Sequence, residues 1–230
     1  MIRLDRFLSN ATALTRSQAQ RVLRAGRVMV DGEVVKQGAI LIPLEAQVLL
    51  DGEPVTAPRS RYLMLHKPLG VVCATQDPTH RTAIDLLDLP NPAGLHFAGR
   101  LDIDATGLVL ITDDGPWSHR IVSPARHCDK RYRVGLDRPL TEAEAQPLRE
   151  GVQLRGEEKI TRPATLISIH PDEWLITLSE GRYHQVKRMF AAVGCKVISL
   201  HRESIGPLSL DPRLEAGTYR ELTPEEIGLF

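Results

Sequence analysis

The chain has 230 residues, of which 42% are hydrophobic and 25% charged, and its formal net charge is zero. This length and composition suit one medium domain, or a small domain followed by a larger one, each with its own core, and they exclude a disordered chain. No apolar run approaches the roughly 20 residues needed to span a bilayer, so no membrane association is expected.

The N-terminal stretch "MIRLDRFLSN" carries charges where a signal peptide would have its apolar centre, so a cytoplasmic location is expected. Cys73, Cys128 and Cys195 stand far apart without a CxxC pair. This spacing indicates neither a zinc site nor a disulfide framework, and we expect three core thiols.

A net charge of zero argues against nucleic-acid binding, but the charges are unevenly distributed along the chain. Residues 1–30 contain six arginines and one acidic residue, and residues 180–202 contain five lysines or arginines and one acidic residue. Two basic patches on a neutral chain fit local contact with RNA.

The first predicted elements lie in "LTRSQAQRVLRAGRVMVDGEVVK", residues 14–36. Apolar residues recur at helical spacing up to Leu23, Thr15 or Ser17 can cap the helix, and Gly26 can end it. Valines then alternate around Asp31 and Gly32, a pattern typical of a tight β-hairpin.

The arginines of this segment give it a single-sign face that also resembles the S4 RNA-binding module. They are Arg16, Arg21, Arg24 and Arg27. The alternative is a small α/β subdomain whose arginines merely face solvent. A face of one sign is not what solubility alone requires, so RNA binding by these four residues is favoured.

The segment "DGEPVTAPRS", residues 51–60, has two prolines and no helical or strand period, so it is interpreted as a linker. The predicted domains are an S4-like module over residues 1–55, a linker over 56–60 and a second domain over 61–230. In the second domain, helices are predicted in "LTEAEAQPLREGV", capped at Thr141 and ended by Gly151, and in "RYHQVKRMFAAVGCK", ended by Gly194.

The stretch "AGRLDIDATGLVLITDDG", residues 98–115, predicts an apolar strand over 108–111 followed by a turn at "DDG". The strand leaves "GRLD" unexplained. An arginine and an aspartate two positions apart, Arg100 and Asp102, are costly to bury and indicate either a solvated loop or a site.

Four segments, "HKPLGVVCA" (66–74), "GRLDIDATGL" (99–108), "KRY" (130–132) and "EGRYHQVKRMF" (180–190), follow the S4-like module in this order. Together they resemble the RNA pseudouridine synthases that act on the small ribosomal subunit. The resemblance implies an α+β protein, in which the S4-like module is joined to a domain with a large, mainly antiparallel sheet and flanking helices. It also implies isomerisation of uridine to pseudouridine in 16S ribosomal RNA, with uridine 516 as the family target.

That reaction moves no electrons or groups in or out, so no metal or small-molecule cofactor is expected, in agreement with a chain that has no Gly-rich dinucleotide loop. By resemblance Asp102 is the catalytic aspartate, which either attacks ribose C1′ or abstracts a ribose proton; the sequence does not choose between these routes. Asp104 is interpreted as a turn carboxylate. The alternative is an acid and base pair with Asp102, as in an N-glycosidase, but such an enzyme would release the uracil that an isomerase must keep.

The resemblance assigns further residues. Lys187 forms an ion pair with Asp102 and keeps it charged, Tyr132 stacks on the uracil, and Arg100 fills the gap left by the extruded nucleotide. Apart from the resemblance, we expect Arg188 to contact a phosphate group. The remaining predicted lining residues are His184, Gln185 and Leu200.

The expected partner is 16S ribosomal RNA in a partly assembled small subunit, because a neutral chain needs recognition beyond charge. A monomer is expected. The alternatives are a non-catalytic RNA-binding assembly factor, an RNA N-glycosidase, and a pseudouridine synthase acting on the large subunit.

Overall fold

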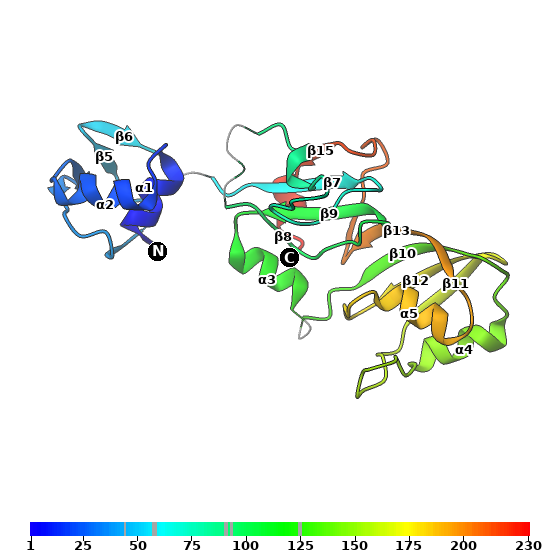
Figure 1. The fold of residues 1–230 in the computed structure, drawn as a ribbon. Helices are drawn as coiled ribbons and strands as arrows, with labels where there is room; N and C mark the ends of the chain where they lie inside the picture. Colours follow the sequence, from blue (N-terminus) through cyan, green and yellow to red (C-terminus); the bar gives the residue numbers. More distant parts are fainter. Residues whose placement is uncertain (44, 57–58, 90–91, 93, 124–125) are drawn as a thin grey trace. The chain divides into compact units, whose positions relative to one another are not determined.

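The computed structural model describes residues 1–43, 45–56, 59–89, 92, 94–123 and 126–230 (Figure 1). Contacts within the chain divide it into two compact units, Met1–Ser60 and Arg61–Phe230. Over the described ranges, no helix has the length and apolar character required to cross a membrane.

The first unit is a small α/β fold. Its elements are β1 (Ile2–Arg3), α1 (Leu4–Ala11), α2 (Arg16–Arg24), β2 (Val28–Val30), β3 (Glu33–Val34), β4 (Leu41–Ile42), β5 (Val48–Leu50) and β6 (Glu53–Val55). Strands β3, β2, β5 and β6 form one sheet in that order, and β1 pairs with β4. Apolar residues of α1, α2 and the sheet share one core, in which Phe7, Leu23 and Val28 are almost fully buried.

Helix α2 begins and ends as predicted. The Thr15 side chain accepts a hydrogen bond from the Gln18 amide, and the Gln18 side chain accepts one from the Thr15 amide, which completes a capping box. Gly26 follows the helix with φ +71°, a left-handed conformation that favours glycine. Helix α1 was not predicted, although its buried Leu4, Phe7 and Leu8 have helical spacing.

Two hairpins of this unit turn on an Asp-Gly pair. Asp31 and Gly32 have φ values of 49° and 88°, and Asp51 and Gly52 have values of 54° and 83°, as a type I′ turn requires. The first hairpin confirms the prediction. The second corrects it, because part of the segment interpreted as a linker is strand β6, paired with β5. Pro54 is tolerated there because β6 is an edge strand. Residues 57–58 of that segment lie outside the described residues.

The second unit contains a large sheet in the order β11-β12-β10-β13-β9-β7-β15, with β14 on β13 and β8 on β9. Its strands are β7 (Tyr62–Lys67), β8 (His96–Phe97), β9 (Thr106–Thr112), β10 (Lys130–Leu136), β11 (Thr165–His170), β12 (Glu173–Leu178), β13 (Val197–Ile205), β14 (Leu208–Ser209) and β15 (Tyr219–Glu221). Its helices are η1 (Ile84–Leu86), α3 (Gly115–Val122), α4 (Glu142–Glu150), α5 (Gln185–Ala192) and α6 (Pro224–Ile227). This architecture confirms the predicted α+β class with a mainly antiparallel sheet.

One junction of the sheet is parallel. Strand β13 is antiparallel to β10 but runs parallel to β9, where Arg202 pairs with Gly107. A Cβ atom on Gly107 would lie 2.3 Å from the Arg202 carbonyl oxygen, so only glycine allows this approach. The junction brings the start of β9, and the loop before it, beside β13 and β10.

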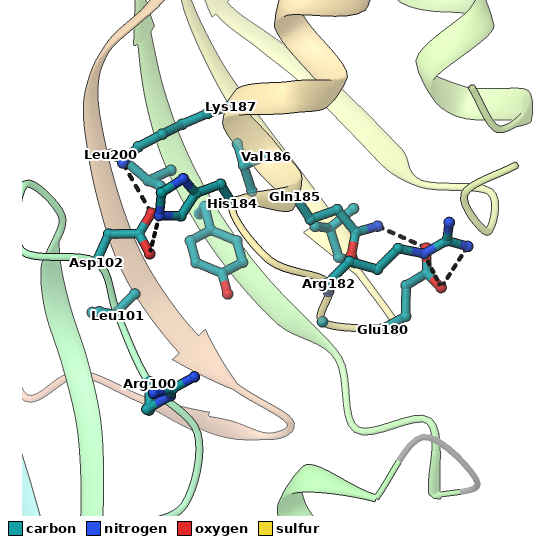
Figure 2. A pocket seen from close by; sticks show the side chains of 13 residues that line it. Arg100, Leu101, Asp102, Glu180, Arg182, His184, Gln185, Val186, Lys187 and Leu200 are labelled. Carbon is teal, nitrogen blue, oxygen red and sulfur yellow. Dashed lines mark hydrogen bonds and ion pairs between the residues drawn. The ribbon is translucent and has the colours of Figure 1, made fainter. Parts of the chain in front are cut away.

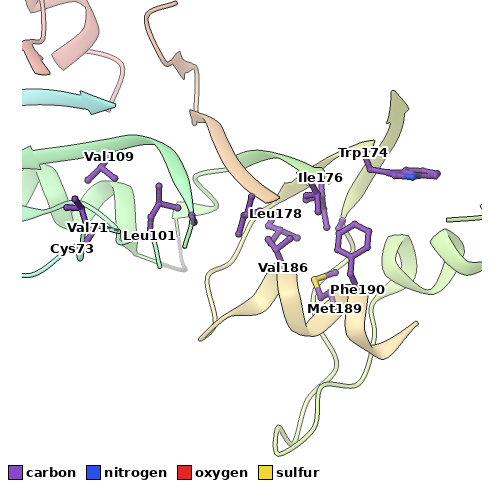
Figure 3. Packing of buried hydrophobic residues seen from close by; sticks show 14 of the residues in the cluster. Val71, Cys73, Leu101, Val109, Trp174, Ile176, Leu178, Val186, Met189 and Phe190 are labelled. Carbon is purple, nitrogen blue, oxygen red and sulfur yellow. Dashed lines mark hydrogen bonds between the residues drawn. The ribbon is translucent and has the colours of Figure 1, made fainter. Parts of the chain in front are cut away.

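Both faces of the sheet around β7 and β9 are buried. Leu65 and Val109 belong to one core, and the intervening Met64 and Leu110 belong to a second core that also contains Trp117 of α3. Figure 3 shows part of the first core, in which Val186 and other apolar residues of α5 point toward β12. In Figure 1, α4 and α5 lie beside the β10–β12 part of the sheet, and α3 lies beside β8 and β9.

The helix ends of this unit follow local signals. The Thr141 capping box starts α4 and Gly151, at φ +109°, follows it, as predicted. Helix α5 ends before Gly194, which also agrees with the prediction. The expected turn at "DDG" is wrong in one respect: the Asp114 side chain accepts a hydrogen bond from the Trp117 amide at 3.0 Å and caps α3.

Candidate active site

The loop Arg100–Ala105, here called the Asp102 loop, connects β8 to β9 and is tied to the protein by its backbone carbonyls. Asp102 O accepts from Ala105 N at 3.1 Å, which forms a turn, and Ile103 O accepts from Gly70 N at 2.9 Å. The loop is therefore fixed locally by its own turn and at long range by the segment 66–74.

Two buried cations hold the two ends of this loop. Arg202 of β13 donates through Nη1 to Arg100 O at 3.2 Å and through Nε to Leu108 O at 2.7 Å. Lys67 of β7 has no exposed surface and donates to Ala105 O at 2.7 Å. Burial lowers the pKa of Lys67. Strand and loop are thus joined by charge-assisted hydrogen bonds, which are stronger than neutral ones.

Helix α5 brings Lys187 to the loop. Val186, Met189 and Phe190 are buried and fix the position of α5, and Lys187 lines the pocket beside the loop. Lys187 Nζ lies 2.9 Å from Asp102 Oδ2, and 24% of its side chain is exposed. The residue before the helix, His184, adopts a left-handed conformation (φ 49°) that directs its ring at Asp102, with Nε2 3.4 Å from Oδ1 (Figure 2).

Asp104 shares the same ammonium group. Lys187 Nζ lies 2.5 Å from Asp104 Oδ1, and the Asp104 side chain is 65% exposed, against 28% for Asp102. The hydrogen bond from Lys187 lowers the pKa of Asp104. Burial acts to lower the pKa of Lys187, but its hydrogen bonds to Asp104 and Asp102 prevail and raise it. A cation therefore lies between the two carboxylates, and Asp102 is the more enclosed of the two.

The pocket in front of Asp102 collects most of the predicted residues. It is lined by Arg100, Leu101, Asp102, Tyr132, Leu178, Glu180, Gly181, Arg182, His184, Gln185, Val186, Lys187 and Leu200. Tyr132 comes from β10 and Leu200 from β13, and the antiparallel pairing of these strands places both at the pocket. The Tyr132 ring also packs against the guanidinium of Arg202, with Cζ 5.9 Å from the ring centroid.

Arg188, which was expected at phosphate, is engaged inside the protein. It forms an ion pair with Glu157 at 2.9 Å and donates to Arg155 O and Tyr183 O. It does not line the pocket. Its guanidinium therefore supports the backbone before α5.

The four predicted N-terminal arginines differ in their partners. Arg16 lies 3.5 Å from the buried carboxylate of Asp5, and Arg27 forms a bidentate ion pair with Asp51. Arg21 and Arg24 are exposed and form no ion pair with the described residues. Two of the four are thus free to meet an external anion.

Sequence reasoning gave no role to Lys67 or Tyr183 and did not predict the contact between Asp104 and Lys187. It counted Arg202 in a basic region expected to contact RNA, whereas Arg202 is buried, with 2% of its surface exposed. The strand period carried a signal for Lys67 and Arg202. Lys67 shares a strand face with the buried Leu65, and Arg202 shares one with Leu200. A charge on an inward strand position needs a partner, and here the Asp102 loop supplies it.

The described residues contain no group of three or more His, Cys, Asp or Glu side chains arranged to hold a metal ion. The chemical resources of the pocket are a carboxylate, an ammonium group, an aromatic ring and an imidazole. Such a set suits a reaction in which the carboxylate attacks a substrate atom or accepts a proton from it, while the substrate base lies against the aromatic ring.

The chain is similar to known proteins in both units. Residues 61–192 match the model of the RNA pseudouridylate synthase family, and residues 2–41 match the S4 domain. The ribosomal small subunit pseudouridine synthase A of Yersinia pestis is 55% identical over 228 residues, which cover 99% of this chain and 97% of that protein. The protein of the same name from Escherichia coli strain K12 is 52% identical, with 99% of each chain covered.

A solved structure described as a pseudouridylate synthase is also similar, with a TM-score of 0.73 and 47% identity over the full length of both chains. The family model, the full-length relatives and the solved structure all point to the same family. The chain belongs to the RNA pseudouridine synthase family and carries an N-terminal S4 domain.

Proposed function

We propose that this enzyme isomerises one uridine of 16S ribosomal RNA, uridine 516, and that Asp102 is its catalytic carboxylate. The observation that carries the proposal is the ion pair of Asp102 with Lys187 at 2.9 Å, in a pocket that also contains Tyr132. The small-subunit substrate is supported by the names of relatives that match the chain at 51–55% identity over nearly all of its length.

The reaction exchanges one glycosidic bond for another. The bond from ribose C1′ to uracil N1 breaks, the ring turns, and C5 bonds to C1′; C5 then loses its hydrogen as a proton and N1 gains one. A charged carboxylate at C1′ can form an ester there, or it can remove the C2′ proton to give a glycal. Deuterium at C2′ distinguishes these routes, because only the glycal route breaks that bond and slows with the heavier isotope.

The residues around Asp102 fit definite tasks in this scheme. Lys187 pairs with the carboxylate at 2.9 Å and holds it at the pocket. Tyr132 offers an aromatic face to the uracil, which must stay in the pocket while it turns. Arg100, exposed at the rim, can occupy the space that the extruded nucleotide leaves in the RNA.

An acid and base pair of Asp102 and Asp104 is disfavoured by the geometry. A hydrolase with two carboxylates leaves room for a water between them, whereas here both carboxylates contact the Lys187 ammonium group. Asp104 is also the more exposed of the two. We therefore assign Asp104 to the orientation of Lys187.

The test compares Asp102→Asn with Asp104→Asn under single turnover, with tritium release from C5-labelled uridine in 16S RNA as the readout. Asp102→Asn should lower the rate by at least about a thousandfold, because the amide can neither attack C1′ nor accept the proton from C2′. Asp104→Asn should stay within about tenfold of the parent, or roughly 1.4 kcal/mol. Near-parental release by Asp102→Asn would disprove the assignment.

We further propose that a partly assembled small subunit is the substrate, and that the S4 domain supplies affinity to it. A neutral chain gains little from charge alone, so the shape of the folded RNA has to contribute. Single-turnover rates on free 16S RNA, an assembly intermediate and the finished subunit should be highest on the intermediate. Equal rates on a short bare oligonucleotide would contradict this.

A further inference from the structure

Tyr183 differs from the other aromatic residues of the chain. All Trp, Tyr and Phe side chains lie within the described residues, and Tyr183 alone is exposed, with 75% of its surface accessible. A single exposed apolar side chain needs no explanation by itself. Tyr183 differs from such a residue because it contacts His184, which in turn contacts Asp102.

The Tyr183 ring is stacked on the imidazole of His184. The ring centroids are 3.8 Å apart and the planes are inclined by 20°. His184 in turn reaches Asp102, with Nε2 3.4 Å from Oδ1, and it lines the pocket. Tyr183 itself is not among the residues that line the pocket, so the stacked pair extends from the carboxylate to the outer rim.

The backbone that carries this pair is held on both sides. Gln185 accepts a hydrogen bond from the Arg182 amide at 2.8 Å and donates to Glu180 at 2.7 Å. Arg182 also donates to Lys159 O at 2.7 Å. Figure 2 shows Arg182 and Gln185 gathered around Glu180, with His184 between this cluster and Asp102.

Arg188 completes the support from the other side by donating to Tyr183 O at 3.1 Å while it is paired with Glu157. Arg182 and Arg188 thus both stabilise the backbone around Tyr183. A rigid aromatic ring loses little entropy when it binds a flat partner, so this support favours stacking.

We propose that the outer face of Tyr183 stacks on an unpaired nucleobase of the ribosomal RNA that flanks the target uridine, with Tyr183 and His184 as a two-ring platform. The inference rests on the proposed role of Asp102. Nucleotides next to the target are covalently bound to it and must leave the pocket across its rim. Single-stranded RNA is commonly held by bases stacked on aromatic side chains, at about 1–3 kcal/mol per base.

The experiment uses the full chain with three substitutions. Tyr183→Leu removes the ring, Tyr183→Phe keeps it, and Ile167→Ala changes another exposed side chain, on β11, as a control. The dissociation constant is measured on protein-free 16S RNA and on the assembly intermediate. RNA carrying 5-iodouridine at positions beside the mapped target is irradiated, and the crosslinked residue is identified by mass spectrometry.

Tyr183→Leu should raise the dissociation constant about tenfold on both substrates, which corresponds to ~1.4 kcal/mol, and should lose the crosslink. Tyr183→Phe and Ile167→Ala should stay within about twofold. Parental binding by Tyr183→Leu would overturn the proposal, and so would the absence of a crosslink to Tyr183 in the parent. So would a Phe variant as weak as the Leu variant, which would indicate a contact of the hydroxyl, or a loss confined to the particle, which would indicate a ribosomal protein.

The outcome is separable from that for the catalytic assignment. If Asp102→Asn is inactive and Tyr183→Leu binds like the parent, only the stacking platform is wrong. If Asp102→Asn remains active, the proposed catalytic residue is wrong whatever Tyr183 does.

Discussion

Lys187 shows how one residue can serve two carboxylates with different purposes. Its ammonium group contacts the enclosed Asp102 and the exposed Asp104, and the pKa of Lys187 is raised while that of Asp104 is lowered. A raised lysine pKa stabilises the fold below the ordinary value of 10.5 and loses its effect as pH rises through the folded value. A lowered Asp pKa stabilises it above the ordinary value of 3.8 and loses its effect as pH falls. The ion pair between Lys187 and Asp104 is therefore intact across neutral pH.

Asp104→Asn should lower the pKa of Lys187 relative to the parent, because one of its two charged acceptors becomes neutral while Asp102 remains. The ¹³Cε chemical shift of Lys187, followed from neutral to alkaline pH, measures this directly. An unchanged midpoint would show that Asp104 does not influence Lys187. Asp129→Asn, which lies outside the pocket, is the matched control.

Among the elements, the Asp102 loop depends on strand β13 more than on its own sequence. Arg202 donates to the carbonyl oxygens of Arg100, at the start of the loop, and of Leu108, in the following strand β9, and it packs against Tyr132. Its Nη2 has no hydrogen-bond partner among the described residues. Its hydrogen bonds to backbone carbonyls and its contact with the Tyr132 ring thus link the Asp102 loop to strand β10.

Arg202→Met should lower the single-turnover rate at saturating RNA by about a hundredfold, because small displacements of a reacting group are costly. It should also lower the free energy of unfolding by about 1–3 kcal/mol for each carbonyl left unpaired. Arg133→Met, on the same sheet, is the control: the Arg133 side chain is 43% exposed and pairs with Glu173 and Glu203, so its loss should change neither quantity strongly. A thermal unfolding scan and the tritium assay measure the two effects. Loss of stability with a normal rate would show that Arg202 does not position the site.

Local signals decided which elements could be predicted. Helices α2 and α4 have a Thr capping box and a terminal glycine, and both were found. Helix α3 was missed because its cap, Asp114, lies in a "DDG" that equally favours a turn. Strand β6 was missed because its proline indicated a linker, although the Asp51-Gly52 pair carried the same hairpin signal as Asp31-Gly32.

At the scale of the whole molecule, a neutral chain carries its positive charge in two places. In the first unit, Arg16 and Arg27 are paired with Asp5 and Asp51, whereas Arg21 and Arg24 are exposed. In the second unit, Arg182, Lys187, Arg188 and Arg202 are used within the protein, whereas Lys196 is exposed. The charge available to phosphate is therefore smaller than the sequence count indicates.

The double substitution Arg21→Gln with Arg24→Gln should weaken binding to 16S RNA and flatten its salt dependence. Two lost phosphate contacts should reduce the slope of log K against log salt by about 1.4 on single-stranded RNA. Arg27→Gln, which removes a paired arginine, is the matched control and should change the slope less. A slope unaltered by the double substitution would show that this face does not meet RNA.

The sequence alone determined the features that depend on neighbours in the chain: the capped helices, the first hairpin, the two basic regions, and the motifs that indicated an RNA pseudouridine synthase. Through its place in "GRLD" and the resemblance to that family, the sequence also pointed to Asp102. Only the tertiary structure decided how that aspartate is held. Lys67, Lys187 and Arg202 reach the Asp102 loop from β7, α5 and β13, and contacts over such separations follow from the register of the sheet. Burial and the pairing of distant strands decide which charged side chains have partners within the protein, and these contacts cannot be read from the local sequence.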